Sequence, residues 1–238
     1  WKIIHNDNGS VSLQFIKSFV GHTKLVFDAI VNEHKPGELV SCSWDTSIRV
    51  WDLDTGENIK TLPSNQAIQT LAWWKQDKFL IEAGRTSPFE IHIREWHNGK
   101  NDKSVIPSGK KIRTLVGHIE SVRQLIVLED KNQLLSCGDD RSIRLWNLNN
   151  GTQLKTLSFH SNYVLSMCSI KGTSLYVSAG TDRTVKFWNQ EKVVYTIENI
   201  FNGSVWCALY SSKMQMLITS SLDKTVKGFK VKIENDKV

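Results

Sequence analysis

The chain has 238 residues, of which 40% are hydrophobic and 23% charged, and its formal net charge at pH 7 is +6. These values are ordinary for a soluble globular protein, and no apolar run approaches the roughly 18 residues that a membrane-spanning helix needs. Only four prolines and many polar, turn-rich segments favour an all-β chain. The chain begins at Trp1 without a methionine, so a targeting segment ahead of it stays open.

Residues 1–20 are typical of the end of a repeated unit. Residues 1–4 predict a short strand, Asn8-Gly9 predicts a turn, and the alternating segment 11–20 (VSLQFIKSFV) predicts an outer strand. The first two strands of this unit are missing. We therefore expect either that the chain is a piece of a longer one or that this N-terminal hairpin pairs with the last unit.

A unit of about 40 residues then repeats along the chain. Residues 41–62 read SCSWDTSIRVWDLDTGENIKTL, and residues 136–157 read SCGDDRSIRLWNLNNGTQLKTL. Each stretch predicts three strands, because apolar and polar residues alternate and turn signals such as Asn150-Gly151 separate them. A further strand, such as 25–31 in the first unit, begins each repeat. The units cover residues 21–62, 63–116, 117–157, 158–197 and 198–238.

Two of the five units diverge from this pattern. In the second, residues 85–88 (RTSP) replace the aspartate turn, and a loop insertion at 97–110 is longer than the corresponding turn elsewhere. The fifth keeps Thr219 and Asp223, but it has Phe229 where others have tryptophan, and it lacks the histidine. It also stops after its third strand, so we expect its fourth strand to come from elsewhere.

The repeats share a fixed spacing of polar and aromatic residues. An aspartate lies six residues before an aromatic residue in four units, and a Ser or Thr lies four residues before each aspartate. In three units a histidine lies 22 or 23 residues before the aspartate. The complete sets are His22, Ser41, Asp45 and Trp51; His118, Ser136, Asp140 and Trp146; and His160, Ser178, Asp182 and Trp188.

With these motifs the chain resembles the WD40-repeat β-propellers. Trp51-Asp52 is a full WD dipeptide, and Trp146-Asn147 and Trp188-Asn189 are near copies. The resemblance covers nearly the whole chain and implies one all-β domain, residues 1–238, with five four-stranded blades and an N-terminal partial blade or closing strand (1–20). Because seven blades are usual in the family, we expect these blades to be part of a seven-bladed ring. Family members commonly close the ring by letting the N-terminal strand complete the last blade.

The recurring Ser, His and Asp also raise the alternative of acyl-transfer catalysis. A nucleophile needs an exposed, strained turn, and the chain has no G-x-S-x-G motif. The resemblance implies instead that each set forms a hydrogen-bonded structural tetrad with its tryptophan. Phosphate-binding, dinucleotide-binding, zinc-protease and EF-hand motifs are also absent from the sequence. We therefore predict no catalytic residue, no cofactor and no enzymatic activity.

The cysteines and two histidines could in principle serve metal or redox chemistry. Four cysteines at positions 42, 137, 168 and 207 lack CxxC spacing and recur at similar places in different units, which favours small buried side chains over disulfide or zinc sites. Free thiols favour an intracellular home, cytoplasmic or nuclear. His92 and His97 could form a metal pair, but isolated surface histidines are the favoured interpretation.

The resemblance implies that partners dock on the face that carries the loops into each first strand and the turn before each aspartate. Aromatic residues and arginine dominate binding hot spots, and this ring contains several of them. We therefore expect a non-catalytic scaffold that docks peptide or protein partners, within a multiprotein complex. Packing between blades is the alternative for Phe27 and Trp206 above all. The candidate partner-binding residues are Phe27, Trp44, Gln69, Arg123, Asp139, Tyr163, Thr181, Trp206 and Leu222.

Two further functions stay open at this point. The lysines of the 100–111 loop could bind nucleic acid or an acidic surface, although no aromatic residues are interleaved with them, which makes nucleic acid the less favoured partner. The propeller could also be the substrate-recognition or targeting part of a larger enzyme complex, such as a ubiquitin ligase or a kinase.

Overall fold

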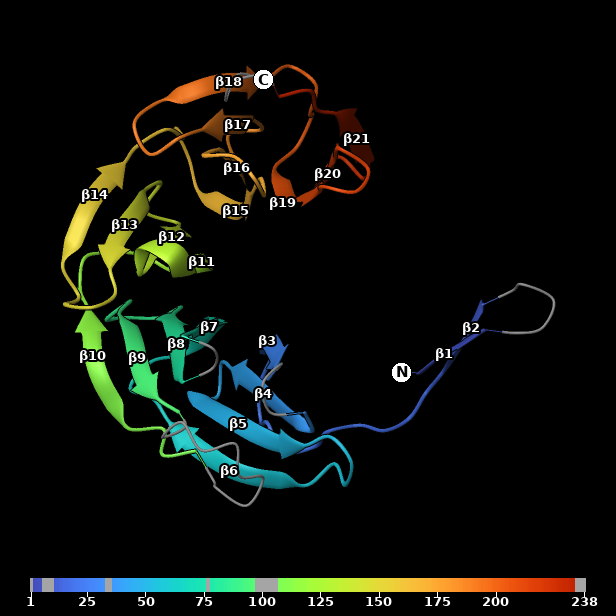
Figure 1. The fold of residues 1–238 in the computed structure, drawn as a ribbon, viewed down its shortest axis with the longest axis vertical. Coiled ribbons are helices and arrows are strands. Elements are labelled where there is room, and N and C mark those ends of the chain that lie inside the picture. Colours follow the sequence, from blue (N-terminus) through green and yellow to red (C-terminus); the bar gives the residue numbers. More distant parts are fainter. Residues whose placement is uncertain (1, 6–10, 33–35, 76–77, 97–106, 234–238) are drawn as a thin grey trace.

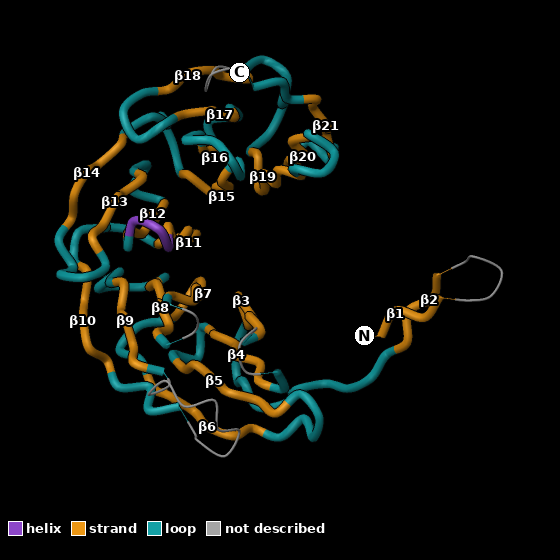
Figure 2. Tube along the Cα trace, in the orientation of Figure 1, coloured by secondary structure: helices purple, strands orange, loops and turns teal. Residues whose placement is uncertain are grey.

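The structure is a computed structural model of the 238-residue chain. It describes residues 2–5, 11–32, 36–75, 78–96 and 107–233. Strands dominate the described chain, and one short 3-10 helix at Glu129–Lys131 joins two of them (Figure 2). No helix among the described residues is long and apolar enough to cross a membrane. The predicted all-β propeller fold is confirmed.

Each repeat folds into one antiparallel sheet, or blade, whose strands follow chain order. Blade 1 comprises β3 (Val26–Val31), β4 (Glu38–Ser43), β5 (Ser47–Asp52) and β6 (Asn58–Pro63). Blade 2 comprises β7 (Ile68–Trp74), β8 (Phe79–Gly84), β9 (Ile91–Glu95) and β10 (Lys111–Leu115). Blade 3 comprises β11 (Val122–Leu128), β12 (Gln133–Gly138), β13 (Ile143–Asn147) and β14 (Gln153–Leu157). Blade 4 comprises β15 (Val164–Ser169), β16 (Tyr176–Gly180), β17 (Val185–Trp188) and β18 (Val193–Ile197), and blade 5 comprises β19 (Val205–Ser211), β20 (Met216–Ser221) and β21 (Val226–Lys230).

The five blades stand side by side in an open arc (Figure 1). The first strand of each blade lines the inside of the arc, and the fourth strands β6, β10, β14 and β18 form its outer margin. The N-terminal segment extends away from blade 1 and ends in a separate hairpin of β1 (Lys2–His5) and β2 (Val11–Gln14).

Turn chemistry fixes the register within a blade. In blade 1, Asp45 accepts a hydrogen bond from the backbone N–H of Ser47 at 3.0 Å, and Thr46 between them adopts a left-handed φ of 64°. This turn aligns β4 with β5, so that Val40 pairs with Val50. Gly56, at φ 82°, makes the next reversal into β6, a conformation that glycine adopts without steric cost. Successive side chains of each strand then point to opposite faces of the sheet, and the apolar side chains on these faces are buried.

Neighbouring blades share their hydrophobic cores. Each of the four clusters of buried residues joins two adjacent blades, as in the one that holds Trp74 and Ile81 of blade 2 with Val122 and Trp146 of blade 3. Because a single sheet cannot cover its own apolar face, stacking of the blades supplies the burial that stabilises them. The sequence pattern predicts this arrangement, but it does not show which residues meet.

Hydrogen bonds between the inner strands also join successive blades. Asp28 accepts from the backbone N–H of Leu71 at 2.9 Å, and Gln124 accepts from that of Met167 at 2.7 Å. The Ser166 hydroxyl accepts from the N–H of Ala208 at 3.2 Å. The three acceptors occupy equivalent positions, the third residue of the inner strand, although their side chains differ in type.

The two ends of the described chain differ in part from the sequence expectation. The outer strand predicted over 11–20 ends at Gln14, residues 15–20 have no strand structure, and the predicted Asn8-Gly9 turn lies outside the described residues. Within the described chain, β21 pairs with β20 alone, whereas the other blades have a fourth strand. Beside β21 and β18 lies a cavity of about 240 Å³, whose lining combines apolar residues such as Phe187, Ile197 and Phe229 with Thr196, Glu198 and Lys230. Closure of a ring by the N-terminal strand stays a prediction.

Candidate functional site

Three blades contain the same buried polar cluster, which we call the clasp. In blade 3, His118 Nδ1 lies 2.8 Å from Asp140, His118 Nε2 lies 2.7 Å from Ser136 Oγ, and Trp146 Nε1 donates to Ser136 Oγ at 2.8 Å. The structure thus brings together the four residues of each complete set. The matching distances are 2.8, 2.8 and 2.8 Å in blade 1 (His22, Ser41, Asp45, Trp51) and 2.8, 2.7 and 3.1 Å in blade 4 (His160, Ser178, Asp182, Trp188).

The donors and acceptors of the clasp follow from its chemistry. A carboxylate only accepts, so Nδ1–H of His118 donates to Asp140, and the Nε2 lone pair of the neutral ring accepts from the Ser136 hydroxyl. Burial is the main cause that lowers the pKa of His118, which favours this neutral ring. Burial alone would raise the pKa of Asp140, but hydrogen bonds from His118 and Ser142 hold it well below its ordinary value.

The clasp has the hydrogen-bond order of a Ser-His-Asp triad, yet its serine is closed to a substrate. Ser136 and Ser178 have no exposed surface, and each Oγ already accepts from a buried tryptophan N–H. A nucleophile must reach the reacting carbon, and these oxygens face only protein groups. The geometry therefore favours a structural role, in which each clasp joins the loop that enters a blade to its second and third strands.

Blade 2 replaces the neutral clasp with a buried network of charged side chains. Glu82 stands at the serine position and Arg94 at the tryptophan position, as the strand register shows. His92 Nδ1 lies 2.6 Å from Glu82 Oε1, and Arg94 donates to the same oxygen at 3.0 Å. His92 Nε2 lies 2.9 Å from Glu90. Burial would raise the pKa of Glu82, but hydrogen bonds from His92 and Arg94 hold it below its ordinary value.

This network corrects the prediction that His92 is an isolated surface histidine. Its exposed fraction is 0%, because it lies within a blade between two glutamates. The other histidine of the pair, His97, lies outside the described residues. Within the described ranges, no group of three or more His, Cys, Asp or Glu is arranged to hold a metal ion.

Blade 5 replaces the clasp with an aromatic pair. Phe201 and Phe229 meet edge to face with ring centroids 6.2 Å apart, at the histidine and tryptophan positions. Asp223 still accepts from the backbone N–H of Asn202 at 3.1 Å, as Asp182 accepts from Ser161 in blade 4. Thr219 remains buried, and its hydroxyl donates to a backbone carbonyl. In blade 5 apolar packing thus joins the entering loop to the third strand, as the clasp does in blades 1, 3 and 4.

The cysteines follow the packing prediction at three of their four positions. Cys42 and Cys137 are fully buried, and burial raises the pKa of both thiols. Cys168 is half-buried, and burial raises its pKa to about 12. Cys207 is exposed, so the prediction is wrong there. It occupies the inner-strand position from which Ser166 reaches the next blade, and no blade follows it in the described chain.

The predicted partner-binding residues lie at one end of the blades, which we call the rim. In every blade the residue after the second strand donates its backbone N–H to the carbonyl just before the first strand, at 2.8 or 2.9 Å. The donors are Trp44, Arg85, Asp139, Thr181 and Leu222, and the acceptors are Leu25, Ala67, Ser121, Tyr163 and Ser204. This repeated bond shows that Arg85 belongs to the rim. Sequence reasoning missed it because no aspartate follows it to mark the position.

On blades 1 to 3 the rim side chains form two groups of contacts. The Phe27 and Trp44 rings lie 6.2 Å apart, and the guanidinium of Arg85 lies 4.6 Å from the Phe27 centroid and 5.4 Å from the Trp44 centroid. Arg85 also donates to Gln69. Arg123 binds Asp139 through two hydrogen bonds, of 2.7 and 2.6 Å. The structure thus brings three of the nine predicted residues, Phe27, Trp44 and Gln69, into contact with Arg85, and it joins two more, Arg123 and Asp139, in an ion pair on blade 3.

On blades 4 and 5 three of the four predicted rim residues are exposed. Trp206 is 50% exposed and Leu222 is 63% exposed, and Tyr163 and Trp44 are exposed at 39% and 40%. Thr181 is half-buried above Tyr163. Trp206 therefore does not pack between described blades, whereas Phe27 is half-buried against Trp44 and Arg85.

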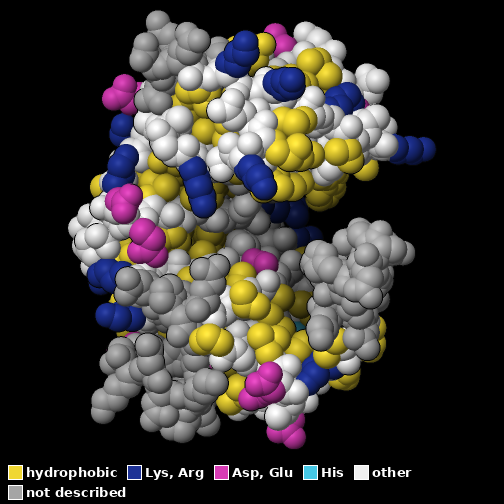
Figure 3. Space-filling view, turned by 45° about the vertical axis from the view of Figure 1, so that its right-hand side comes forward, with side chains coloured by type: hydrophobic (Ala, Val, Ile, Leu, Met, Phe, Trp, Pro, Cys, Tyr) yellow, Lys and Arg dark blue, Asp and Glu magenta, His cyan; other side chains and the backbone are white. Residues whose placement is uncertain are grey.

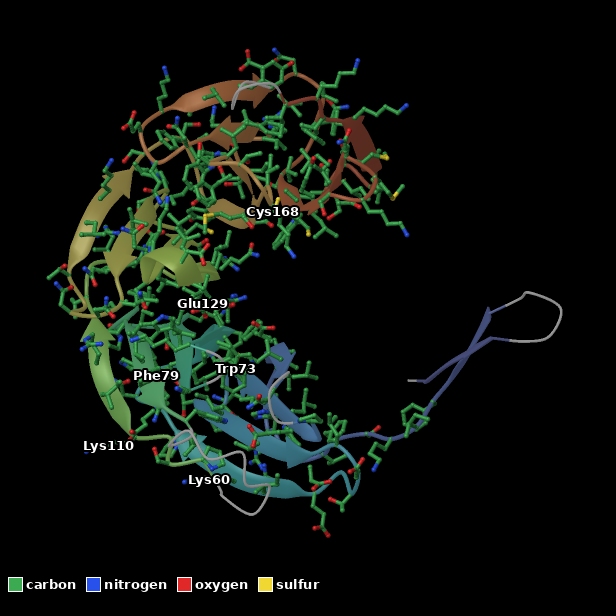
Figure 4. All side chains as sticks on the ribbon, in the orientation of Figure 1. Lys60, Trp73, Phe79, Lys110, Glu129 and Cys168 are labelled. Atoms are coloured by element: carbon green, nitrogen blue, oxygen red, sulfur yellow. The ribbon has the colours of Figure 1, made fainter. Side chains whose placement is uncertain are left out.

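The basic loop of the sequence analysis lies only partly within the described chain. Lys100 and Lys103 fall outside it, and Lys110 and Lys111 are exposed near the outer margin, where Lys60 also lies (Figure 4). Lys60 Nζ donates to the carbonyls of Pro107 and Ser108 at 2.7 and 3.2 Å. In the view of Figure 3, Lys and Arg side chains are scattered over the described surface and do not gather into one patch.

Comparison with known proteins agrees with this architecture. The family model described as "WD domain, G-beta repeat" matches residues 13–52, 109–147, 151–189 and 192–229, which together exceed half of the chain. Residues 53–108, which include most of the divergent blade 2, lie outside these matches.

Curated relatives can be aligned with about half of this chain. Nuclear distribution protein PAC1 of Arthroderma otae is 30% identical over 138 residues, 56% of this chain and 28% of the relative. Serine-threonine kinase receptor-associated protein of Mus musculus is 25% identical over 133 residues, 56% and 34% of the two chains. Pre-mRNA-processing factor 17 of Homo sapiens is 22% identical over 135 residues, 55% and 21%. The matches thus span between about a fifth and a third of each relative. From its motifs, its blades and the family model, the chain belongs to the WD40-repeat family.

Proposed function

We propose that the chain is a non-catalytic scaffold that binds a peptide or protein partner on the rim. The observation that carries this proposal is the set of exposed aromatic side chains at one end of the blades: Trp44 and Tyr163, which take part in the repeated backbone bond, and Trp206 on β19. Large exposed aromatic side chains gain free energy when a partner covers them, and they dominate measured binding hot spots.

The clasps support the same proposal from the opposite direction. Their serines are buried, so the residues that resemble a catalytic triad stabilise the blades and leave the rim as the surface for recognition. The names of the relatives, a nuclear distribution protein, a receptor-associated protein and a pre-mRNA-processing factor, are consistent with work inside multiprotein assemblies. This scaffold could serve a ligase or kinase complex, a narrower alternative that fits the same rim.

The test is the double variant Trp44→Ala and Tyr163→Ala in the 238-residue chain. We expect it to lose most of the partners that the unchanged chain captures, as quantified by affinity purification and mass spectrometry, with a melting temperature within a few degrees of the parent. Tyr195→Ala is the matched control, because this exposed tyrosine lies on the outer strand β18, away from the rim. Equal partner recovery by the double variant and the control contradicts the proposal.

Binding of nucleic acid through the basic loop is separated by its salt dependence. Binding to phosphates weakens steeply with salt, because counterions are released. The amount of partner captured by an aromatic rim should change little between about 50 and 300 mM salt. Over this range the Debye length, the distance over which charges interact, falls by a factor of about two. The nucleic-acid alternative is favoured if binding falls steeply with salt and is lost on substitution of Lys110 and Lys111, but not on substitution of Trp44.

A further inference from the structure

Arg85 differs from the other rim residues in its charge and in its neighbours. At the four equivalent positions stand Trp44, Asp139, Thr181 and Leu222, so Arg85 is the one cation at this place in the five described blades. Its guanidinium lies 4.6 Å from the Phe27 centroid, and within the described chain this group has one hydrogen-bond partner, the neutral side chain of Gln69. The Nε and Nη2 groups of Arg85 have no partner among the described residues.

No carboxylate of the described residues forms an ion pair with Arg85. The neighbouring Asp139 is already engaged by Arg123, through two hydrogen bonds of 2.7 and 2.6 Å. Partial burial lowers the pKa of Arg85, the positive charge of Arg123 lowers it further, and Asp139 offsets only part of this. A partly buried cation beside a second cation is a position where an arriving anion gains more than it would at an open surface.

The rings beside Arg85 add orientation to this charge. Phe27 and Trp44 both lie within cation–π distance of the guanidinium, so its plane is held by contacts on the rim. A planar guanidinium presents paired N–H groups that match the two oxygens of a carboxylate or phosphate group. Trp44, which is 40% exposed, offers an apolar surface directly next to that anion position.

We propose that Phe27, Trp44, Gln69 and Arg85, together the arginine–aromatic cluster, bind an acidic side chain of a peptide, with the next apolar side chain of that peptide against Trp44. The anionic group is a carboxylate or a phosphate, since both satisfy the free N–H groups of Arg85. A basic peptide is disfavoured, because Asp139 is already neutralised by Arg123. This inference rests on the proposed scaffold function and specifies the chemistry of its partner.

The probes are three pools of synthetic octapeptides with random flanks and a fixed centre of Glu-Phe, phosphoserine-Phe or Gln-Phe. Each pool is passed over the immobilised 238-residue chain, and retained peptide is quantified by mass spectrometry. We expect at least one acidic pool to be retained about 10- to 100-fold more than the Gln-Phe pool, the range that a hydrogen bond to a charged group supplies. The comparison of the two acidic pools identifies carboxylate or phosphate as the preferred anion.

Arg85→Gln removes the charge and should reduce retention of the acidic pool to that of the Gln-Phe pool. Arg183→Gln is the matched control, because Arg183 is exposed on the equivalent turn of blade 4. Arg85→Lys keeps the charge without the paired N–H groups, so intermediate retention is expected; this variant keeps the test decisive if Arg85→Gln fails to fold.

Equal retention of the acidic and neutral pools, or equal loss in Arg85→Gln and Arg183→Gln, overturns the inference. So does a single-stranded oligoribonucleotide that binds more tightly than either acidic pool and is released by Arg85→Gln. If Trp44→Ala with Tyr163→Ala abolishes partner capture while Arg85→Gln leaves it intact, this inference fails and the scaffold function stands. If neither change matters, both fail.

Discussion

Replacement of Ser136 by alanine is the most direct test of the clasp. The Ser136 hydroxyl accepts from Trp146 at 2.8 Å and bonds His118 at 2.7 Å, and the side chain is fully buried. Alanine nearly conserves the volume, so the change removes polar contacts without opening a large cavity. Each buried group left unpaired costs about 1–3 kcal/mol, so we expect a loss of roughly 2–6 kcal/mol in the free energy of unfolding.

Urea unfolding followed by tryptophan fluorescence, with differential scanning calorimetry, measures this loss. In a domain of this size, each kcal/mol lowers the melting temperature by roughly 2–4 °C, so a fall of at least about 4 °C is expected. Ser158→Ala is the control, since Ser158 is exposed in the connection between blades 3 and 4 and its replacement should change stability by less than about 0.5 kcal/mol. If Ser136→Ala melts with the Ser158 control, the clasp does not stabilise blade 3 and the reasoning is refuted.

Two further predictions concern charge. Glu82→Gln should destabilise the chain by about 3–5 kcal/mol in urea unfolding, because it leaves the buried charge of Arg94 uncompensated, whereas Glu120→Gln at the exposed surface should be neutral. An unchanged stability of Glu82→Gln would show that the network is dispensable. The melting temperature should also fall as the pH drops below about 6.5, the ordinary pKa of histidine. Because the pKa of His118 is lowered in the folded chain, the unfolded chain binds a proton at a higher pH, and stability falls as the pH drops. The lowered pKa of Asp140 contributes stability that is lost only when the pH falls below the ordinary pKa of an aspartate. His118→Gln should flatten the pH dependence between pH 7 and 5, and an unchanged slope contradicts this assignment.

Much of this fold can be predicted because each repeat carries its own signals. The strand Ser47–Asp52 lies within the stretch 41–62 from which alternation and turn residues predict three strands, and Glu38–Ser43 overlaps the start of that stretch. The clasp members are separated by as many as 29 residues, from His22 to Trp51, yet their spacing recurs, so the family resemblance assigns them to one cluster before any distance is known. Short-range turn geometry then sets the register that brings them together.

The contacts between blades could not be predicted in the same way. Asp28, Gln124 and Ser166 perform one task at one position with three different side chains, so no residue pattern marks them. Arg85 was missed on the rim for a related reason, since its place is defined by a backbone hydrogen bond to Ala67 and not by a side-chain motif. A position that uses only main-chain atoms leaves the side chain free to vary, and sequence patterns are then silent.

The charged network of blade 2 and the arginine on its rim belong to the same segment of chain. In blade 1 only Trp44, Asp45 and Thr46 separate the second strand from the third, whereas in blade 2 residues 85–90 do so. This longer segment is held at its end by Glu90, which bonds His92 at 2.9 Å, and at its start by the Arg85 backbone. A clasp that needs an aspartate in a tight turn would not accommodate it.

The buried charges of blade 2 therefore permit a loop that the other blades cannot have. Because Glu82 and Arg94 hold the strands from within, the turn no longer has to supply the aspartate that closes the clasp. Its residues are then free to serve the rim, where Arg85 meets the aromatic side chains of blade 1. Blade 2, which lacks the clasp, is thus the one that carries Arg85, the residue on which the proposed peptide site depends.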